Sequence, residues 1–386
     1  MNSIYKVVRR ELLIIRKRPV YILASLGVLL VNTVFYLSLM QDGLPHDLPI
    51  GLVDEDQSST SRSFATQLDA TQLGQVIYYD DLHLARADME TGKITAFVLI
   101  PDGFNADIQA NRQPHLSYYV NSLYFVGGAL AYKDILTMAN LTNGAVQRQV
   151  LRAKGVNERE IRGRIQPIVL DQHQIGNPAT NYGVYLNGVI LPGVLEMIVI
   201  LITIYAVGSE LKYGTSKHLM RTTGGSIEKA LLGKLLPYNI IFTALGIGLE
   251  LLLFHWLKYP LQGSLWWMFL DILLLVTASE AVGLLIIELF PVLRLAISVG
   301  AIISVLGFSL AGFSLPVSSM PPYVQGFSAM FPLRHYYLFH VQQTLWGSGF
   351  AGCWQEIVHL MVFMLLPPLF MRRLEDAYVN QNYERD

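Results

Sequence analysis

Five acidic residues lie inside long apolar stretches of this sequence. They are Glu196, Glu250, Asp271, Glu280 and Glu288. A carboxyl group inside a bilayer usually faces a bundle interior or water, where it can bind a cation, a proton or a cationic substrate. The alternative is neutral, hydrogen-bonded contact between helices, or, for Asp271 and Glu288, a side chain that reaches back to the interface. Glu196, Glu250, Asp271 and Glu280 are the polar candidates, and the two interpretations balance only for Glu196 and Glu280.

The residues of a soluble enzyme site are missing from the sequence. The phosphate-binding pattern G-x-x-x-x-G-K-[ST] does not occur, so any ATP must be bound by another chain. The acidic run 54–56 lacks the spaced ligands of a calcium loop. The single cysteine, Cys353, excludes an intramolecular disulfide and a cysteine-based zinc site. Surface exposure explains His83 and His115, and interfacial packing explains the other histidines near the ends of the apolar stretches, His255, His335, His340 and His359. We therefore predict no catalytic residue, cofactor or metal on this chain.

The composition indicates a membrane protein. Of 386 residues, 52% are hydrophobic and 15% are charged, whereas an average soluble domain has about 25% charged residues. The mean hydropathy of +0.40 argues against disorder and against an ordinary cytosolic enzyme. The net charge of −1 gives no basic field that would recruit nucleic acid.

Six apolar stretches are long enough to cross a hydrocarbon core, which takes about 20 helical residues. They are 19–40, 184–207, 235–257, 266–288, 293–315 and 350–371. A cleaved signal peptide is the alternative for the first stretch, but its apolar run is too long and no cleavage site follows it. Four prolines interrupt the chain after the fifth stretch, so we predict an external re-entrant segment at 316–349 that contains Met320, Pro321 and Pro322.

The distribution of lysine and arginine sets the expected orientation. Six of these residues precede the first stretch, and five lie in the connection 208–234, whereas the opposite short connections hold only Lys258 and Arg334. Both termini and the loop 208–234 are therefore predicted to be cytoplasmic. Residues 1–18 alternate apolar and basic positions with a helical period, which predicts an amphipathic helix in the cytoplasmic headgroup plane, or otherwise a simple topogenic charge cluster. Residues 372–386 form the cytoplasmic tail.

The polar stretch 41–183 is predicted to be an external α/β domain. Its strand-like runs are 48–53, 75–79, 94–100 and 115–120, and its helix-like runs begin near 59, 82, 104 and 121. The predicted fold class is thus an α-helical polytopic membrane protein with six transmembrane helices, five of them in the bundle 184–371, and an inserted external α/β domain.

Three groups of motifs carry a resemblance to a known family. The first is PIGLVDEDQS at 49–58 with IPDGF at 100–104, like the family's VDxDxS and IPxGF segments. The second is ELKYGT at 210–215, like its E-x-E-x-G-T loop, with Lys212 where a second acid is usual. The third is SMPP at 319–322 followed by FPLRHY at 331–336. In this order, the whole chain resembles the permease subunit of ABC-2 type exporters, in the subgroup with a large external domain and a type V ABC exporter-like fold.

The resemblance implies an ATP-driven exporter of the cell inner membrane. Such permeases work as homo- or heterodimers, each docked on a cytoplasmic ABC ATP-binding subunit that binds ATP and Mg. Glu210, Gly214 and Thr215 would then lie at the ATPase contact, with Arg221, Glu228 and Lys229 on its flank, although a solvated basic loop is the alternative. The substrate favoured is amphipathic or hydrophobic, drug- or lipid-like, exported from the cytoplasm or the inner leaflet, and the external domain is consistent with a periplasmic adaptor protein.

Two other functions fit parts of the sequence. A proton- or cation-coupled secondary transporter would use the intramembrane carboxylates, but the internal repeat of many such folds is missing. A non-transporting, membrane-anchored sensor or scaffold needs only one or two spans, so six spans with internal carboxylates exceed that requirement.

Overall fold

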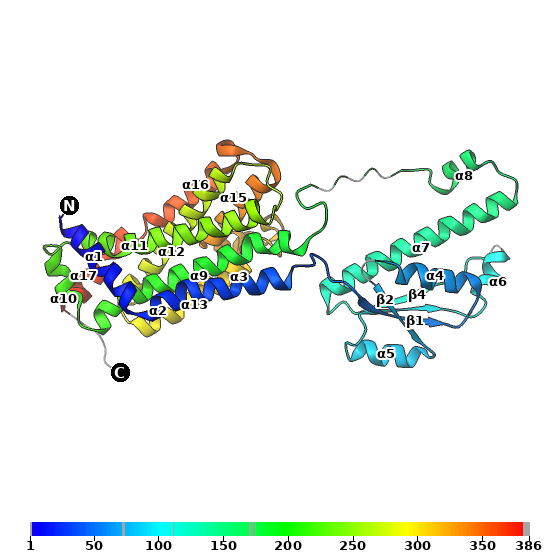
Figure 1. Cartoon of the computed structure of the whole chain (residues 1–386), viewed down its shortest axis with the longest axis horizontal. Coiled ribbons are helices and arrows are strands. Elements are labelled where there is room, and N and C mark those ends of the chain that lie inside the picture. The colour runs from blue at the N-terminus through cyan, green and yellow to red at the C-terminus, as the bar shows by residue number, and fades with distance from the viewer. Residues whose placement is uncertain are drawn as a thin grey trace. The chain divides into compact units, whose positions relative to one another are not determined.

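The computed structural model describes residues 2–71, 74–110, 112–169, 171, 173 and 175–380. Its contacts divide the chain into two compact units. One unit combines Met1–Gln41 with Gln174–Asp386, and the other is Asp42–His173. Figure 1 shows the helical bundle of the first and the sheet of the second.

The smaller unit is built on a four-stranded sheet of order β2-β1-β3-β4. The strands are β1 Leu48–Asp54, β2 Gly74–Tyr79, β3 Ala96–Ile100 and β4 Ser117–Val120, and the helices are α4 Ser59–Asp69, α5 Leu82–Glu90, α6 Phe104–Gln109, α7 Phe125–Ala153 and α8 Glu158–Ile165. β1 pairs in parallel with β2 and with β3, and β4 is antiparallel to β3. The strands lie where the sequence predicts them, although β3 and β4 begin two residues later and α7 four residues later than predicted.

Both faces of this sheet are covered because its central strands are buried on each side. Ile50 and Leu52 of β1 pack in one cluster with residues of α4 and α7. Val53, the next residue along β1, packs in a second cluster with Ala85 of α5. Successive side chains of a strand point to opposite faces, so α4 and α7 cover one face and α5 the other, as Figure 1 shows.

The acidic turn after β1 is closed by its own hydrogen bonds. The Asp54 carboxylate accepts from the backbone N–H of Gln57 at 2.9 Å and from the hydroxyl of Ser61 at 2.7 Å. The hydroxyl of Ser58 accepts from the backbone N–H of Ser61 at 3.1 Å and caps α4. This turn therefore uses its oxygens to begin a helix, which starts at Ser59 where the sequence predicts a helix-like run.

The larger unit is a helical bundle. Its helices are α1 Asn2–Lys17, α2 Pro19–Ile22, α3 Val28–Leu39, α9 Tyr182–Lys212, α10 Ser216–Thr222, α11 Ile227–Glu250, α12 Leu265–Leu289, α13 Leu293–Ser309, α14 Pro322–Ser328, α15 Pro332–Val341, α16 Gly349–Met364 and α17 Pro367–Asn380. Among the described residues, five helical stretches are long and apolar enough to cross a membrane: Pro19–Leu39, Tyr182–Lys212, Ile227–Trp256, Leu265–Leu289 and Gly349–Asn380. The protein is therefore a polytopic helical membrane protein.

Three predicted boundaries differ from the structure. The fifth predicted span, 293–315, corresponds to the 17-residue helix α13, which at 1.5 Å per residue is about 26 Å long. The predicted loop 208–234 is mostly helical, because α9 continues to Lys212 and α11 begins at Ile227. The predicted tail from 372 is helical to Asn380, the end of α17.

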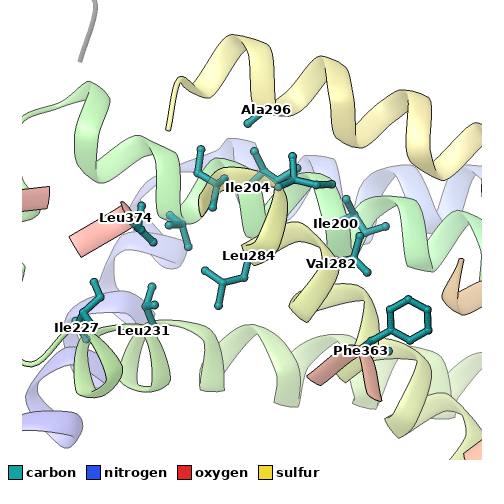
Figure 2. Packing of buried hydrophobic residues seen from close by; sticks show 14 of the residues in the cluster. Ile200, Ile204, Ile227, Leu231, Val282, Leu284, Ala296, Phe363 and Leu374 are labelled. Carbon is teal, nitrogen blue, oxygen red and sulfur yellow. The ribbon is translucent and has the colours of Figure 1, made fainter. Parts of the chain in front are cut away.

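The bundle packs around α9 and α12. Figure 2 shows Ile200 and Ile204 of α9 against Val282 and Leu284 of α12, with Ala296 of α13 beside them. The stretch Pro19–Leu39 differs, since most of its large apolar side chains are exposed. An apolar exposed surface of this kind suits a lipid environment or a further helix.

A close crossing of α9 and α12 gives a first prediction. A Cβ atom at Gly283 would lie 2.8 Å from the backbone oxygen of Ile200, which cannot rotate away. Gly283→Ala is expected to lower the free energy of unfolding by about 1–3 kcal/mol, the usual result of overpacking. The matched control is Gly248→Ala, because no described heavy atom lies within 4 Å of a Cβ there. The control should be neutral or up to about 1 kcal/mol stabilising. Unfolding of both variants in detergent measures the difference, and equal effects would contradict the close crossing.

Candidate functional site

Four charged side chains from three helices meet inside the end of the bundle that carries α10. We name Arg10 and Glu11 of α1, Glu210 of α9 and Lys234 of α11 the ion cluster. The Lys234 ammonium donates to both Glu11 oxygens at 2.8 and 2.9 Å and to Glu210 Oε1 at 2.8 Å. Arg10 donates to the two Glu210 oxygens at 2.8 and 3.0 Å. The cluster therefore ties α1, α9 and α11 together.

The ion cluster is buried and balanced in charge. The side chains of Lys234, Glu11 and Glu210 are 1%, 0% and 3% exposed, and that of Arg10 is 23% exposed. Burial opposes the charge of Arg10, but hydrogen bonds and attraction to Glu210 outweigh it and raise the pKa of Arg10 above its ordinary value. Two cations against two anions give zero net charge, and buried charges are tolerated only when each has such partners.

Neutral groups complete the hydrogen bonding of the two carboxylates. The Tyr238 hydroxyl donates to Glu11 Oε1 at 2.9 Å, and the Thr215 hydroxyl donates to Glu210 Oε2. Every carboxylate oxygen of Glu11 and Glu210 therefore has a donor. A fully satisfied buried network is rigid, whereas losing one member leaves the others uncompensated.

The local sequence explains how these helices come so close. Gly214 follows the end of α9 and has a φ of 65°, which glycine adopts without strain. This turn of the backbone lets the N–H of Thr215 donate to the carbonyl of Glu210 at 2.9 Å. On α11, a Cβ at Gly233 would lie 2.8 Å from Cβ of Val7. The glycine thus lets α1 approach α11 one residue before Lys234.

The six predicted coupling residues divide into two groups. Glu210 is buried in the ion cluster and Thr215 is half-buried against it, so Glu210 does not reach the surface where the sequence analysis places it. Gly214, Arg221, Glu228 and Lys229 are exposed. We name the exposed lysine, arginine and glutamate side chains of α10 and of the first turn of α11 the α10 surface; it comprises Lys217, Arg221, Glu228 and Lys229.

The buried side of α10, opposite the α10 surface, packs against the bundle. Leu219 and Met220 of α10 are buried in the main core cluster, and the Ser216 hydroxyl donates to the carbonyl of Tyr378 in α17 at 2.9 Å. Ser226 caps α11 by accepting from the backbone N–H of Lys229 at 3.3 Å. A force applied to α10 is therefore transmitted to α9, α11 and α17 together.

The intramembrane carboxylates are buried inside the bundle, and Asp271 lies close enough to Glu250 for the two to interact electrostatically. One oxygen of Glu196 accepts from the backbone N–H of Leu333, and Glu250 accepts from the Tyr336 hydroxyl at 2.8 Å. The first contact joins α9 to α15, and the second joins α11 to α15. Asp271 and Glu288 are fully buried, and none of their carboxylate oxygens has a hydrogen-bond partner among the described residues. Neither side chain is therefore exposed on the surface of the described bundle.

Glu280 lies on a groove between α11, α12 and α17. Its Oε2 accepts from the Asn239 amide at 2.9 Å, and the same amide donates to the Thr277 hydroxyl at 3.1 Å. The groove has a volume of about 730 Å³, and the rest of its lining is mostly leucine and methionine, including Leu235 and Met371. Glu228 is a further charged residue of the lining. A mostly apolar groove with a few polar side chains suits an amphipathic ligand.

The proline-rich segment is partly buried. Met320 is buried, whereas Pro321 and Pro322 are exposed. Pro322 begins α14 and Pro332 begins α15, and proline suits the first helical position because its missing N–H has no intrahelical partner there. The prolines thus start the helix that carries Tyr336 toward Glu250.

Of the four members of the ion cluster, the sequence indicates only Glu210 as a site residue. Glu11 interrupts the amphipathic pattern of the first helix, and this exception is the signal of a buried partner. Arg10 and Lys234 appear in the sequence only as charges that set the orientation. Glu11 and Lys234 lie 223 positions apart, so no local pattern links them.

Comparison with known proteins covers most of the chain. Residues 19–370 match a family described as "ABC-2 family transporter protein". Over 321 residues the chain is 25% identical to the inner membrane transport permease YhhJ of Escherichia coli (strain K12), with 81% of each protein covered. The inner membrane transport permease YhhJ of Shigella flexneri matches to the same extent.

Proposed function

Because the chain belongs to the ABC-2 transporter family and so is a transport permease, we propose that it is the membrane-spanning subunit of an ATP-driven exporter. A separate ABC subunit binds ATP and Mg, and two permease subunits, identical or different, form the path. The substrate is amphipathic or hydrophobic, drug- or lipid-like, and leaves the cytoplasm or the inner leaflet. The protein lies in the inner membrane with both termini in the cytoplasm.

The observation that carries this proposal is the pair of hydrogen bonds at the start of α10, from Thr215 to Glu210 of the ion cluster and from Ser216 to Tyr378. Lys217, Arg221 and Lys229 give the α10 surface a basic character, which favours an acidic groove on the partner. When two ATP-binding subunits close on ATP, the force on α10 passes through Glu210 to α9 and through Lys234 to α11. Helices tied in this way move as one body, which is what a pump needs in order to couple ATP closure to opening of a path.

An arrangement of one span before the external domain and five spans after it completes the proposed topology. In it, α13 is the short fifth span, and residues 41–183 form the external domain, which passes substrate to a periplasmic adaptor protein. The 316–349 segment, with Met320, Pro321 and Pro322, is external and re-entrant. The similarity to an inner membrane transport permease supports the proposed location of the protein in the inner membrane.

A second function is favoured by one specific observation. Asp271 and Glu288 are buried carboxyl groups with unpaired oxygens, as expected of a proton- or cation-coupled secondary transporter without an ATPase. A non-transporting scaffold has no comparable support, since the family is one of transporters.

Purification of the protein from its native membrane in several mild detergents separates the two functions. We expect an ATP-binding subunit with a phosphate-binding loop to co-purify, and its ATP hydrolysis to change when the permease is present. If no such subunit is recovered in any detergent, and ATP depletion leaves transport intact while collapse of the proton gradient abolishes it, the secondary transporter is correct.

Glu280 gives a prediction about the substrate path. Glu280→Gln keeps the shape of the side chain but replaces the buried carboxyl group with an amide that cannot ionise or pair with a cation, so export of a cationic amphipathic dye should fall at least about ten-fold, since a hydrogen bond to a charged group contributes about 1.5–3 kcal/mol. Glu196→Gln is expected to act in the same direction. The control is Asp376→Asn, an exposed carboxylate of α17. Unchanged export at normal expression of Glu280→Gln would show that Glu280 serves packing only.

A further inference from the structure

Two histidines and a glutamate converge where α15 meets α16. His335 lies on α15, and Glu356 and His359 lie one turn apart on α16. One ligand atom from each of the three side chains lies within 4.8 Å of the other two. His335 Nδ1 is 2.6 Å from Glu356 Oε2, and His359 Nδ1 is 3.8 Å from the same oxygen. The two imidazole rings are stacked with centroids 4.6 Å apart.

The second ring nitrogen of His335 is already occupied. His335 Nε2 lies 3.0 Å from the carbonyl oxygen of Ala329, which can only accept a hydrogen bond. Nε2 therefore carries the proton, and in the neutral ring Nδ1 presents a lone pair toward Glu356. Metal-binding histidines usually donate their other N–H to a backbone carbonyl in this way, which fixes the tautomer and the ring orientation.

From this geometry we propose that His335, Glu356 and His359 bind a divalent transition-metal ion of the zinc class. Two histidines and one carboxylate leave one position open in a tetrahedral site. Bond lengths of about 2.0–2.1 Å require ligand atoms about 3.3 Å apart, so His359 must turn slightly inward and Glu356 must move back from His335. The His359 side chain is 54% exposed and free to turn, whereas that of His335 is 3% exposed and held.

The Arg334 guanidinium attracts the Glu356 carboxylate, but its described hydrogen bonds go to other groups. Arg334 donates to the carbonyl of Gln325 and to the hydroxyl of Ser328, which occupies one of its terminal nitrogens. The alternative occupant of the site is a proton, in which case His335 is an imidazolium paired with Glu356. A bound ion would fasten α15 and the end of α14 to α16, and this inference does not depend on the proposed function.

Zinc binding by the full-length protein tests the site. The protein is purified in detergent with a tag that contains no histidine, stripped with a chelator and titrated with Zn²⁺ against a chromophoric chelator. We expect one tight site per chain. His359→Ala removes a partly exposed ligand with little risk to folding. It should weaken zinc binding by more than ten-fold, because removal of a group that only orients a metal ligand already weakens binding by at least about ten-fold. Glu356→Gln should do the same.

The matched control is His255→Ala, which changes an exposed histidine at the end of the third candidate span. This variant should bind zinc as tightly as the unaltered protein does. Zinc should also raise the unfolding temperature of the unaltered protein and of His255→Ala, but not that of His359→Ala. The proposal is overturned if the unaltered protein binds zinc no more tightly than His359→Ala. That result would assign the cluster to a histidine–glutamate ion pair.

Discussion

Lys234→Met is expected to destabilise the bundle by about 3–5 kcal/mol, the usual cost of removing one partner from a buried ion pair. Methionine matches the length of lysine but donates no hydrogen bond. Glu11 would lose two hydrogen bonds and Glu210 one, and both carboxylates would remain buried. Unfolding in mild detergent measures the loss, and the amount of protein in the membrane should fall with it.

The control for this prediction lies on the same helix. Lys229→Met changes an exposed lysine of α11, and surface changes of this kind usually stay within about 0.5 kcal/mol. A second variant separates charge from packing: in the Lys234→Met background, Glu11→Gln should restore part of the stability, because it removes the uncompensated charge. If Lys234→Met and Lys229→Met have equal effects, or Glu11→Gln destabilises further, the ion cluster does not stabilise the bundle.

Arg221→Glu is expected to prevent assembly with the ATP-binding subunit while leaving the permease folded. Arg221 is exposed on the α10 surface, and placing a like charge against an acidic partner costs several kcal/mol. Each 1.4 kcal/mol is a factor of ten in affinity, so recovery of the partner and transport should both fall more than about ten-fold. Co-purification and export from cells measure the two effects.

The control for Arg221→Glu is the same reversal in the smaller unit. Arg159 is also exposed, at the start of α8, and Arg159→Glu should leave assembly and transport unchanged. Elution of both variants at the volume of the unaltered permease shows that they are folded. Normal recovery of the ATP-binding subunit with Arg221→Glu would place the contact on another surface.

The positions of the helices and strands followed from the sequence because local patterns determine them. Hydropathy alone located Pro19–Leu39, and a short apolar run before an acidic turn located β1. The end of α13 was overestimated because the residues after Ser309 are as apolar as those before it, and composition alone does not show where a backbone leaves the helix. Gly312, with a φ of 101°, marks that departure only in three dimensions.

The candidate sites were harder to predict because they join distant positions. The ELKYGT run indicated Glu210, but its partners Arg10 and Lys234 come from other helices. Similarly, Glu356 and His359 are one turn apart, yet the third ligand, His335, lies 21 positions before Glu356. Each histidine alone was adequately explained by interfacial packing, and only the crossing of α15 and α16 brings the three groups together.

The ion cluster also constrains the order in which the protein is made. Glu11 is translated 223 positions before Lys234, its partner in the cluster. Until α11 has been made, the Glu11 carboxylate has no Lys234 ammonium to pair with. Docking of α1 through this pair is therefore possible only after α11 has been translated.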